Sequence, residues 1–137
     1  MGHRFSDLDS VGAAVGMFRA VRSMNKPVQI ALDKQKNLVK PLLEKLFQAG
    51  YSEDDFLPPE AALDLVNPKT VVIILDTHVP HVVESEAIYR AAKNVVVIDH
   101  HRKLVGHIDN AVIFFHEPYA SSTCEMVTEL LQYFPSR

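Results

Sequence analysis

The chain has 137 residues, of which 47% are apolar and 23% are charged, and its net charge is −3. A chain of this length forms one domain with a core of its own, and its single cysteine, Cys124, excludes an internal disulfide and suits a reducing compartment. The slightly acidic balance excludes broad binding to duplex nucleic acid, which needs a basic surface, but not a small anionic substrate held by metal ions.

The first half of the sequence is predicted to alternate helices with one short strand. Apolar residues at helical spacing predict a helix over 9–24, and a strand over 28–32 follows Pro27. A second helix is predicted over 38–48, with Pro41 in its first turn. A polar stretch and a short helix over 61–65 follow.

The second half contains the apolar runs that indicate a sheet. Residues 70–75 and 95–98 are continuous apolar runs, typical of strands covered on both faces, and a helix over 83–92 joins them. A third buried strand is predicted over 111–115, and an amphipathic helix over 122–134 follows. This order predicts an α/β fold, a doubly wound, mostly parallel sheet with helices on both faces.

Acids and histidines gather in three clusters, which are His3 to Asp9, Asp76 to His78, and Asp99 to His101. The last two clusters directly follow predicted parallel strands, so they are expected at one edge of the sheet. Carboxylates mixed with imidazoles suit Mn²⁺, Zn²⁺ or Fe. Several acids in one pocket favour two cations, about 3.5–4 Å apart, that share a carboxylate.

The first cluster is expected to follow a strand as well, which would place a strand before Met1. A flexible tail over residues 1–8 is the alternative. Asp9 and Asp76 could each cap the following helix in place of binding metal.

The remaining polar residues near the clusters allow two interpretations each. His78 is expected either to contact substrate or to be a satisfied core residue, and Arg102 is expected to contact a phosphate. Lys103 is expected to be a solvated charge. Three other histidines are expected to be ordinary surface or core residues: His81, His107 and His116.

The start of the last predicted helix is a candidate phosphate contact. Ser122 and Glu125 have the spacing of a capping box, and the exposed amides of a helix start attract anions. Ser121 and Ser122 are therefore candidate phosphate contacts, and plain capping is a compatible alternative. Cys124 is interpreted as a small core residue. A GxxxG pattern in the first predicted helix indicates close helix packing.

With these residues in place, the sequence resembles the DHH phosphoesterase family. Its name-giving motif is matched by Asp99-His100-His101, its first metal motif by GHRFSDLDSVGAAVG and its second by DTH. IDHHR followed by EPYASSTCEMVTELLQY is similar to the GdpP-type cyclic-di-AMP phosphodiesterases, more than to the exopolyphosphatase, RecJ-type exonuclease or oligoribonuclease branches. The resemblance covers essentially the whole chain.

The resemblance implies a site with two Mn²⁺ ions. It implies that His3 and Asp7 hold one ion, that Asp9 and His100 hold the other, and that Asp76 bridges them. The implied reaction is the opening of cyclic di-AMP to the linear dinucleotide pApA by a metal-activated water.

The resemblance also implies roles beside the metals. Asp99 would orient a histidine, while His101 and Arg102 would face the substrate phosphate. Asp76, His100 and His101 are therefore the expected catalytic residues.

The sequence differs from the family's pattern because two of the family's features are not found in residues 1–137. A further metal-binding aspartate and the DHHA1 substrate domain, both expected after residue 137, are missing, so residues 1–137 are expected to be a DHH domain that is incomplete at both ends. The resemblance implies a parent protein that is anchored in the membrane by upstream segments, with the site on the cytoplasmic side, and that can form a homodimer.

Two other functions stay open. One is hydrolysis of short oligonucleotides or pAp, as in the oligoribonuclease branch. The other is a metal- or partner-binding fragment without catalytic activity. The isolated chain is expected to hydrolyse little or nothing while the parent is active.

Overall fold

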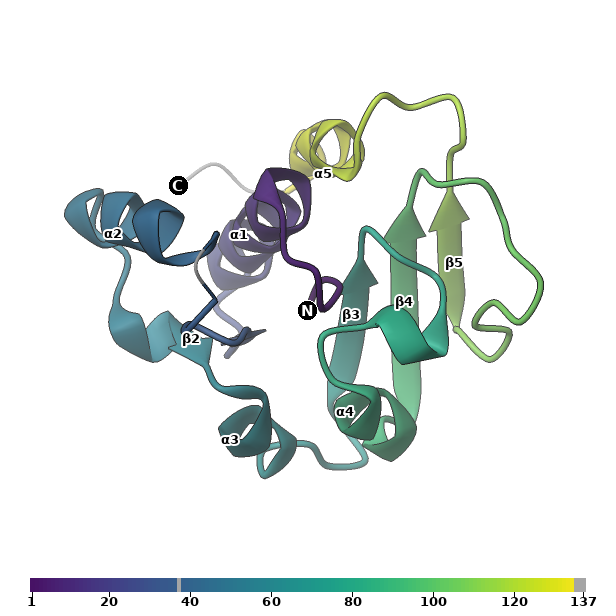
Figure 1. The fold of residues 1–137 in the computed structure, drawn as a ribbon, viewed down its shortest axis with the longest axis horizontal. Coiled ribbons are helices and arrows are strands. Elements are labelled where there is room, and N and C mark those ends of the chain that lie inside the picture. Colours follow the sequence, from purple (N-terminus) through teal and green to yellow (C-terminus); the bar gives the residue numbers. More distant parts are fainter. Residues whose placement is uncertain (37, 135–137) are drawn as a thin grey trace.

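The main sheet has three parallel strands, which are β3 (Val71–Leu75), β4 (Asn94–Asp99) and β5 (Ile113–His116), in the order β3-β4-β5. They come from a computed structural model that describes residues 1–36 and 38–134. In Figure 1 all three strands point the same way, so their carboxyl ends form one edge. The predicted α/β class and the parallel sheet are confirmed.

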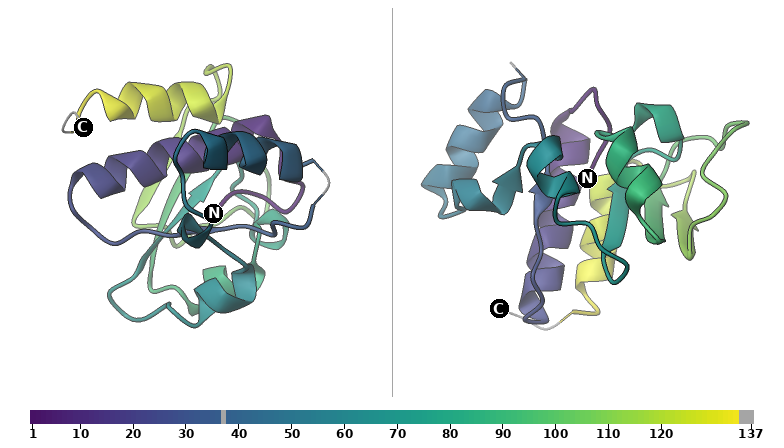
Figure 2. Two further views of the ribbon diagram at one scale, coloured as in Figure 1. Left: turned by 90° about the vertical axis from the view of Figure 1, so that its left-hand side faces the viewer. Right: turned by 90° about the horizontal axis from the view of Figure 1, so that it is seen from below.

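Helices cover both faces of this sheet (Figures 1 and 2). On one face, α1 (Leu8–Ser23) and α5 (Thr123–Leu131) pack on Leu75 and Ile98. On the other face, α4 (Glu86–Ala91) buries Ile88 with Ile74 and Val97. Alternate residues of β3 and β4 therefore point into two separate cores, which explains why these strands read as continuous apolar runs.

The third strand is less buried than the sequence predicts. The expectation of a buried strand over 111–115 is wrong for β5, because Ile113 is 58% exposed and the other strand residues are half-buried. β3 and β5 are the two end strands of the described sheet, but Met1 hydrogen-bonds to β3 along its outer side, while β5 is paired with β4 alone in the part that the structure describes.

The predicted strand over 28–32 does not join the main sheet. It contributes only β1 (Ile30–Ala31), which pairs in parallel with β2 (Phe56–Leu57). Pro58 and Pro59 follow β2 directly and have no amide hydrogen to extend the pairing. The elements around this small sheet are α2 (Lys40–Gln48), a short helical turn (Glu53–Asp55) and α3 (Pro59–Leu63).

The first residues of the chain are part of the folded structure. The Met1 carbonyl accepts from the Leu75 amide at 2.9 Å, and the Met1 ammonium donates to the Ile73 carbonyl at 2.8 Å. His3 forms an isolated antiparallel bridge with Val83, just after the short helical turn Pro80–Val82. Residues 1–7 therefore lie beside β3 and are not a flexible tail.

The two glycines of the GxxxG pattern bring α1 and α5 together. A Cβ on Gly12 would lie 2.8 Å from the Cys124 Sγ, and a Cβ on Gly16 would lie 2.8 Å from the Val127 Cγ1. Both distances are shorter than real Cβ contacts, so this close approach requires glycine. Close helix packing was the predicted role. Among the helices that the structure describes, none is long and apolar enough to cross a membrane.

Because Gly16 and Val127 are in contact, substitutions at the two positions are expected to have non-additive effects on stability. Gly16→Ala is expected to lower the free energy of unfolding by about 1 kcal/mol, because overpacking outweighs the higher helix propensity of alanine. Val127→Ala is expected to cost about 2 kcal/mol through the cavity it leaves. In the double variant the new methyl group occupies that cavity, so the loss measured by urea denaturation should be smaller than the sum. Additive losses would contradict this packing.

Candidate metal centre

The candidate site lies where the loops after β3 and β4 meet the starts of α1 and α5. Asp76 follows β3 directly and has a φ of 67°, in the left-handed region that few residues with a side chain adopt. Its amide donates to the Ile98 carbonyl at 2.9 Å, which holds it against β4. Asp76 is only 2% exposed, so a buried carboxylate stands at the carboxyl edge of the sheet.

The two oxygens of Asp76 face different groups of side chains. Its Oδ2 lies 3.0 Å from the His3 Nε2, which in turn is 3.5 Å from the Asp7 Oδ2. Its Oδ1 lies 3.4 Å from the His100 Nε2 and accepts a hydrogen bond from the Thr123 hydroxyl at 2.9 Å. One carboxylate thus joins two sets of potential ligands, one on each oxygen.

Asp9 belongs to the second set and also caps a helix. Its Oδ2 is 3.5 Å from the His100 Nε2. Its two oxygens accept the amides of Thr123 and Cys124, at 3.0 and 2.8 Å. The alternative that Asp9 caps the following helix is wrong, because the two amides that Asp9 accepts belong to α5, which is remote in sequence. The N-cap of α1 is Asp7, whose Oδ1 accepts from the Ser10 amide at 2.8 Å.

These hydrogen bonds shift two pKa values in opposite directions. Burial raises the pKa of Asp9, but the amides of Cys124 and Thr123 outweigh that effect and hold its pKa below the usual value. Burial, together with the neighbouring Asp9 carboxylate, raises the pKa of the Cys124 thiol to about 12. The thiol therefore stays protonated and is no nucleophile, in line with its interpretation as a packing residue.

Asp99 is completely buried, at 0% exposure, and accepts hydrogen bonds on both oxygens. Its Oδ2 lies 2.6 Å from the His78 Nδ1, and its Oδ1 lies 2.7 Å from the His101 Nδ1. The backbone amide of His100 also donates to Oδ1, at 2.9 Å. Asp99 therefore sets the orientation of two imidazole rings and of the backbone that carries His100.

Hydrogen bonding controls the charge of Asp99. Burial raises its pKa, but the hydrogen bonds from His78 and His101 overcome this effect, so the pKa lies below the usual value. Asp99 is thus a carboxylate at neutral pH.

His78 is enclosed in the protein, although it is one of the expected substrate contacts. It is 1% exposed, its Nδ1 pairs with Asp99, and its Nε2 accepts from the Leu104 amide at 3.0 Å. Its carbonyl accepts from the Ile108 amide at 2.8 Å. Both ring nitrogens are engaged, so in this arrangement His78 supports the loop after β4 and presents no nitrogen to a ligand.

The other histidines lie where ordinary surface or core residues are expected. The His116 Nε2 donates to the His101 carbonyl, and the His107 Nδ1 lies 3.0 Å from the Leu104 carbonyl. His107 and His116 therefore bond to the segment that begins at His101, while His81 is exposed.

The three side chains that follow His100 face solvent. The His101 side chain is 52% exposed, although its ring is held by Asp99, and Arg102 is exposed. Lys103 is exposed too, with its ammonium 5.2 Å from the centre of the Phe114 ring. His101 is therefore fixed on one nitrogen and accessible on the other, which suits contact with a bound anion.

The serines before α5 form a cap that differs from the predicted box. Ser122 is the N-cap, and its hydroxyl accepts from the Glu125 amide at 3.0 Å. The Glu125 carboxylate accepts the Ser121 amide at 2.8 Å, and not the amide of Ser122. The start of α5 is therefore occupied by Asp9, Ser122 and Glu125, and a phosphate contact by Ser121 or Ser122 stays a prediction.

The donor sets fit metal ions. Two groups place one ligand atom of each residue within 4.8 Å of the others: His3 with Asp7 and Asp76, and Asp76 with Asp99, His100 and His101. The His3–Asp76, His3–Asp7 and His100–Asp76 atom pairs are 3.0, 3.5 and 3.4 Å apart, and imidazole nitrogens and carboxylate oxygens are common ligands of one ion. The hydrogen bond to Asp76 raises the pKa of His3, against burial, so a cation here would replace the proton that the two groups share.

Thr123 is the site residue that sequence reasoning missed. It is 0% exposed, and its amide and hydroxyl reach Asp9 and Asp76. Nothing in the sequence points to this role, since Thr123 reads as the first residue of a helix after a serine cap.

Comparison with known proteins agrees with this geometry. The DHH family, N-terminal domain, matches residues 1–137, so the chain belongs to the DHH family. It is 39% identical to the cyclic-di-AMP phosphodiesterase GdpP of Bacillus subtilis over 100% of the chain, and 33% identical to the cyclic-di-AMP phosphodiesterase PdeA of Listeria monocytogenes over 98%. In both cases it spans 21% of the relative.

A solved structure shows the same fold. The exopolyphosphatase-related protein from Bacteroides fragilis matches 96% of this chain and 38% of its own, with a TM-score of 0.70 and 24% identity. The chain is therefore an α/β domain of the DHH family, homologous to cyclic-di-AMP phosphodiesterases.

Proposed function

We propose that this chain is the metal-binding core of a phosphodiesterase that opens cyclic di-AMP to linear pApA. The observation that carries the proposal is Asp76, whose two oxygens face two different sets of ligands. A shared carboxylate is the feature that a two-metal hydrolytic site requires.

The first ion would be held by His3, Asp7 and the Oδ2 of Asp76, and the second by Asp9, His100 and the Oδ1 of Asp76. Mn²⁺ is the metal that we propose, because it accepts mixed carboxylate and imidazole ligands. When bound, two such ions neutralise phosphate charge and lower the pKa of a water molecule.

The residues on the open side of the site would act on the phosphate. Asp99 accepts from one ring nitrogen of His101 at 2.7 Å, so as an imidazolium His101 would donate to a phosphate oxygen from the ring nitrogen that faces solvent. Arg102 follows at the surface and would add a charged contact. For His78 we propose a supporting role, because Asp99 and the Leu104 amide occupy both of its nitrogens.

The substrate is inferred from the relatives. Two of them are named cyclic-di-AMP phosphodiesterases and align with nearly every residue of this chain. Hydrolysis of pApA or pAp is the alternative within the family. The cytoplasmic setting, a membrane anchor and a homodimer of a longer protein stay predictions, as does weak activity of residues 1–137 alone.

A chimera tests the function directly. The matching segment of Bacillus subtilis GdpP is replaced with this chain, and hydrolysis of cyclic di-AMP, pApA and pAp is followed by chromatography with added Mn²⁺. We expect cyclic di-AMP to be converted to pApA, and a His100→Ala chimera to be inactive.

A chimera that folds and binds Mn²⁺ but leaves cyclic di-AMP intact would contradict the proposal. Faster turnover of pApA or pAp than of cyclic di-AMP would support the alternative.

A further inference from the structure

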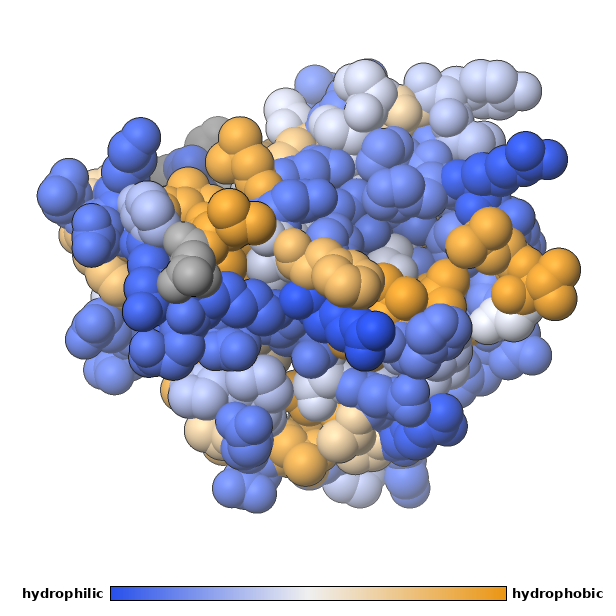
Figure 3. Space-filling model, in the orientation of Figure 1, coloured by the Kyte–Doolittle hydropathy of each residue, from blue (hydrophilic) through white to orange (hydrophobic). Residues whose placement is uncertain are grey.

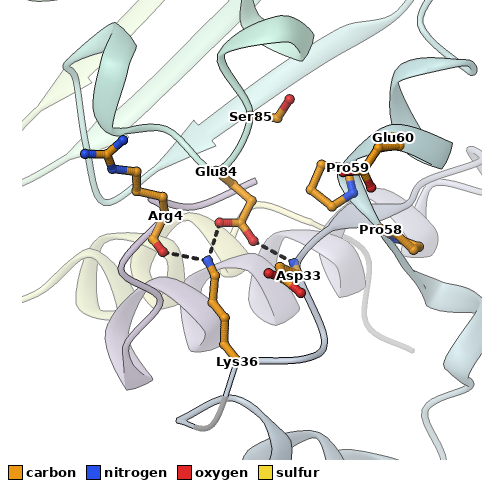
Figure 4. Close-up of a pocket in the computed structure, with 8 residues that line it drawn as sticks. All are labelled: Arg4, Asp33, Lys36, Pro58, Pro59, Glu60, Glu84 and Ser85. Carbon is orange, nitrogen blue, oxygen red and sulfur yellow. Dashed lines mark hydrogen bonds and ion pairs between the residues drawn. The ribbon is translucent and has the colours of Figure 1, made fainter.

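A charged cleft of about 420 Å³ lies next to the loop that carries His3 and Asp7 (Figure 4). It is lined by the segment after β1, the start of α3 and the segment before α4. Its lining residues are Arg4, Asp33, Lys36, Pro58, Pro59, Glu60, Glu84 and Ser85. Of these lining residues, only Arg4 belongs to one of the three clusters of acids and histidines in the sequence.

At its inner wall, Lys36 uses all three hydrogens of its ammonium group. Nζ lies 2.6 Å from the Arg4 carbonyl, 3.0 Å from the Ser6 hydroxyl and 2.6 Å from the Glu84 Oε2. Figure 4 shows the ammonium between the Arg4 carbonyl and the Glu84 carboxylate. A lysine ammonium has three donors, so this one is saturated.

Glu84 is the buried partner of this pair. Its side chain is 2% exposed, against 24% for Lys36. Its Oε1 accepts the Asp33 amide at 2.7 Å, and its own amide donates to the Gly2 carbonyl at 2.9 Å. Glu84 therefore ties the segment after β1 to the first residues of the chain.

The loop over residues 2–7 is thus held from two sides. On one side, the Arg4 amide donates to the Val82 carbonyl at 2.8 Å, and His3 bridges Val83. On the other side, Lys36 binds Arg4 and Ser6, and the Ser6 amide donates back to the His3 carbonyl at 3.2 Å. These contacts fix the backbone that carries His3 and Asp7, the two candidate metal ligands of the first cluster.

We propose that Lys36 is a positioning residue for the metal site, which holds the loop of His3 and Asp7 in the arrangement that faces Asp76. This inference rests on the proposed function. It adds a residue from the segment after β1 that touches neither substrate nor metal. Groups that orient metal ligands typically change affinity by about 10- to 100-fold.

Lys36→Met tests the proposal with two independent measurements. Calorimetry with Mn²⁺ should show about 10-fold weaker binding at the His3 subsite. Amide hydrogen exchange in the absence of metal should become about 10-fold faster at Arg4 and Ser6, with β3 and β4 unchanged. Arg22→Met, which removes the exposed ion pair with Asp55 at 3.1 Å, is the matched control and should change neither.

The double variant Lys36→Met with Glu84→Gln separates positioning from the cost of an unpaired buried charge. Both variants lose the bonds from Lys36 to Arg4 and Ser6, but only the single variant leaves the Glu84 carboxylate unpaired. We expect the double variant to recover stability against urea while its Mn²⁺ affinity stays low and its loop exchange stays fast.

Recovery of metal affinity and slow exchange together with stability would overturn the proposal, as would a single variant with both unchanged. If the unaltered chain binds no Mn²⁺, the proposed function fails, and the exchange measurement still decides whether Lys36 holds the loop.

Discussion

Replacing Asp76 with asparagine is expected to weaken both of the proposed metal sites at once. The carboxylate is shared, so the loss of one oxygen ligand and one negative charge affects both ligand sets. We expect Mn²⁺ affinity measured by calorimetry to fall by about 100-fold or more, and turnover by the active chimera to fall by about 10³-fold.

Asparagine is the appropriate replacement because of the backbone. Asp76 has a φ of 67°, which asparagine tolerates far better than alanine does. An alanine at this position would add strain to the loss of ligands, and the two effects could not be separated. Urea denaturation in the presence of a chelator checks that the variant folds.

Asp109→Asn is the matched control, because Asp109 is an exposed acid in the loop between β4 and β5. It should bind Mn²⁺ as the unaltered chain does. If the variant instead binds two ions, each with an affinity within about threefold of that of the unaltered chain, that result would refute the proposal that Asp76 is shared by two metal sites.

Replacing Asp99 with asparagine is expected to give the largest loss of stability in the chain. It removes a buried charge that accepts from His78 at 2.6 Å and from His101 at 2.7 Å, and the single oxygen of the asparagine amide can accept from only one of these two donors. Breaking a buried pair of this kind costs about 3 kcal/mol or more. Urea denaturation of the metal-free chain measures this loss, with the exposed Asp64 replaced by asparagine as the control.

The same substitution should change how stability depends on pH. The pKa of Asp99 in the fold lies below its usual value of 3.8, so its contribution is present above pH 3.8 and is lost as the pH falls through the folded pKa. The difference between the unaltered chain and the variant should therefore be constant above about pH 5 and shrink in acid. A difference below about 1 kcal/mol, or one that grows in acid, would contradict the role of Asp99.

One exposed apolar region of the surface has no part in the proposed function. The face in Figure 3 is mostly hydrophilic, with apolar residues at the side of the loop between β4 and β5. Val105 is 103% exposed, and Leu104, Val112 and Ile113 are each more than half exposed. Leu104, Val105 and Val112 belong to the loop between β4 and β5, and Ile113 is the first residue of β5.

Much of the candidate site could be predicted from local sequence. Apolar runs that end at Asp76 and at Asp99 place these acids at one sheet edge, because parallel strands joined by a helix end on the same side. The structure has them there, with His100 reaching Asp76 at 3.4 Å. The GxxxG spacing likewise predicts close helix packing, and the structure identifies α5 as the helix that packs on α1.

The prediction that failed concerns accessibility. The apolar run at 111–115 resembles the two buried strands, yet β5 is an edge strand and is partly exposed. For His78 the sequence left two interpretations open, and in the structure it is a buried residue with both nitrogens engaged. Strand order and the path of a later loop decide these outcomes, and neither is encoded in the residues nearby.

By itself the sequence determined the element types, the parallel edge and the residues that can bind metal, because periodicity and residue chemistry are local properties. Only the tertiary structure decided that Asp9 caps α5 across 114 residues and that the Lys36 ammonium donates to the Arg4 carbonyl 32 residues away. Such hydrogen bonds depend on which surfaces pack together, and a buried carboxylate or ammonium takes whichever partners that packing brings within reach.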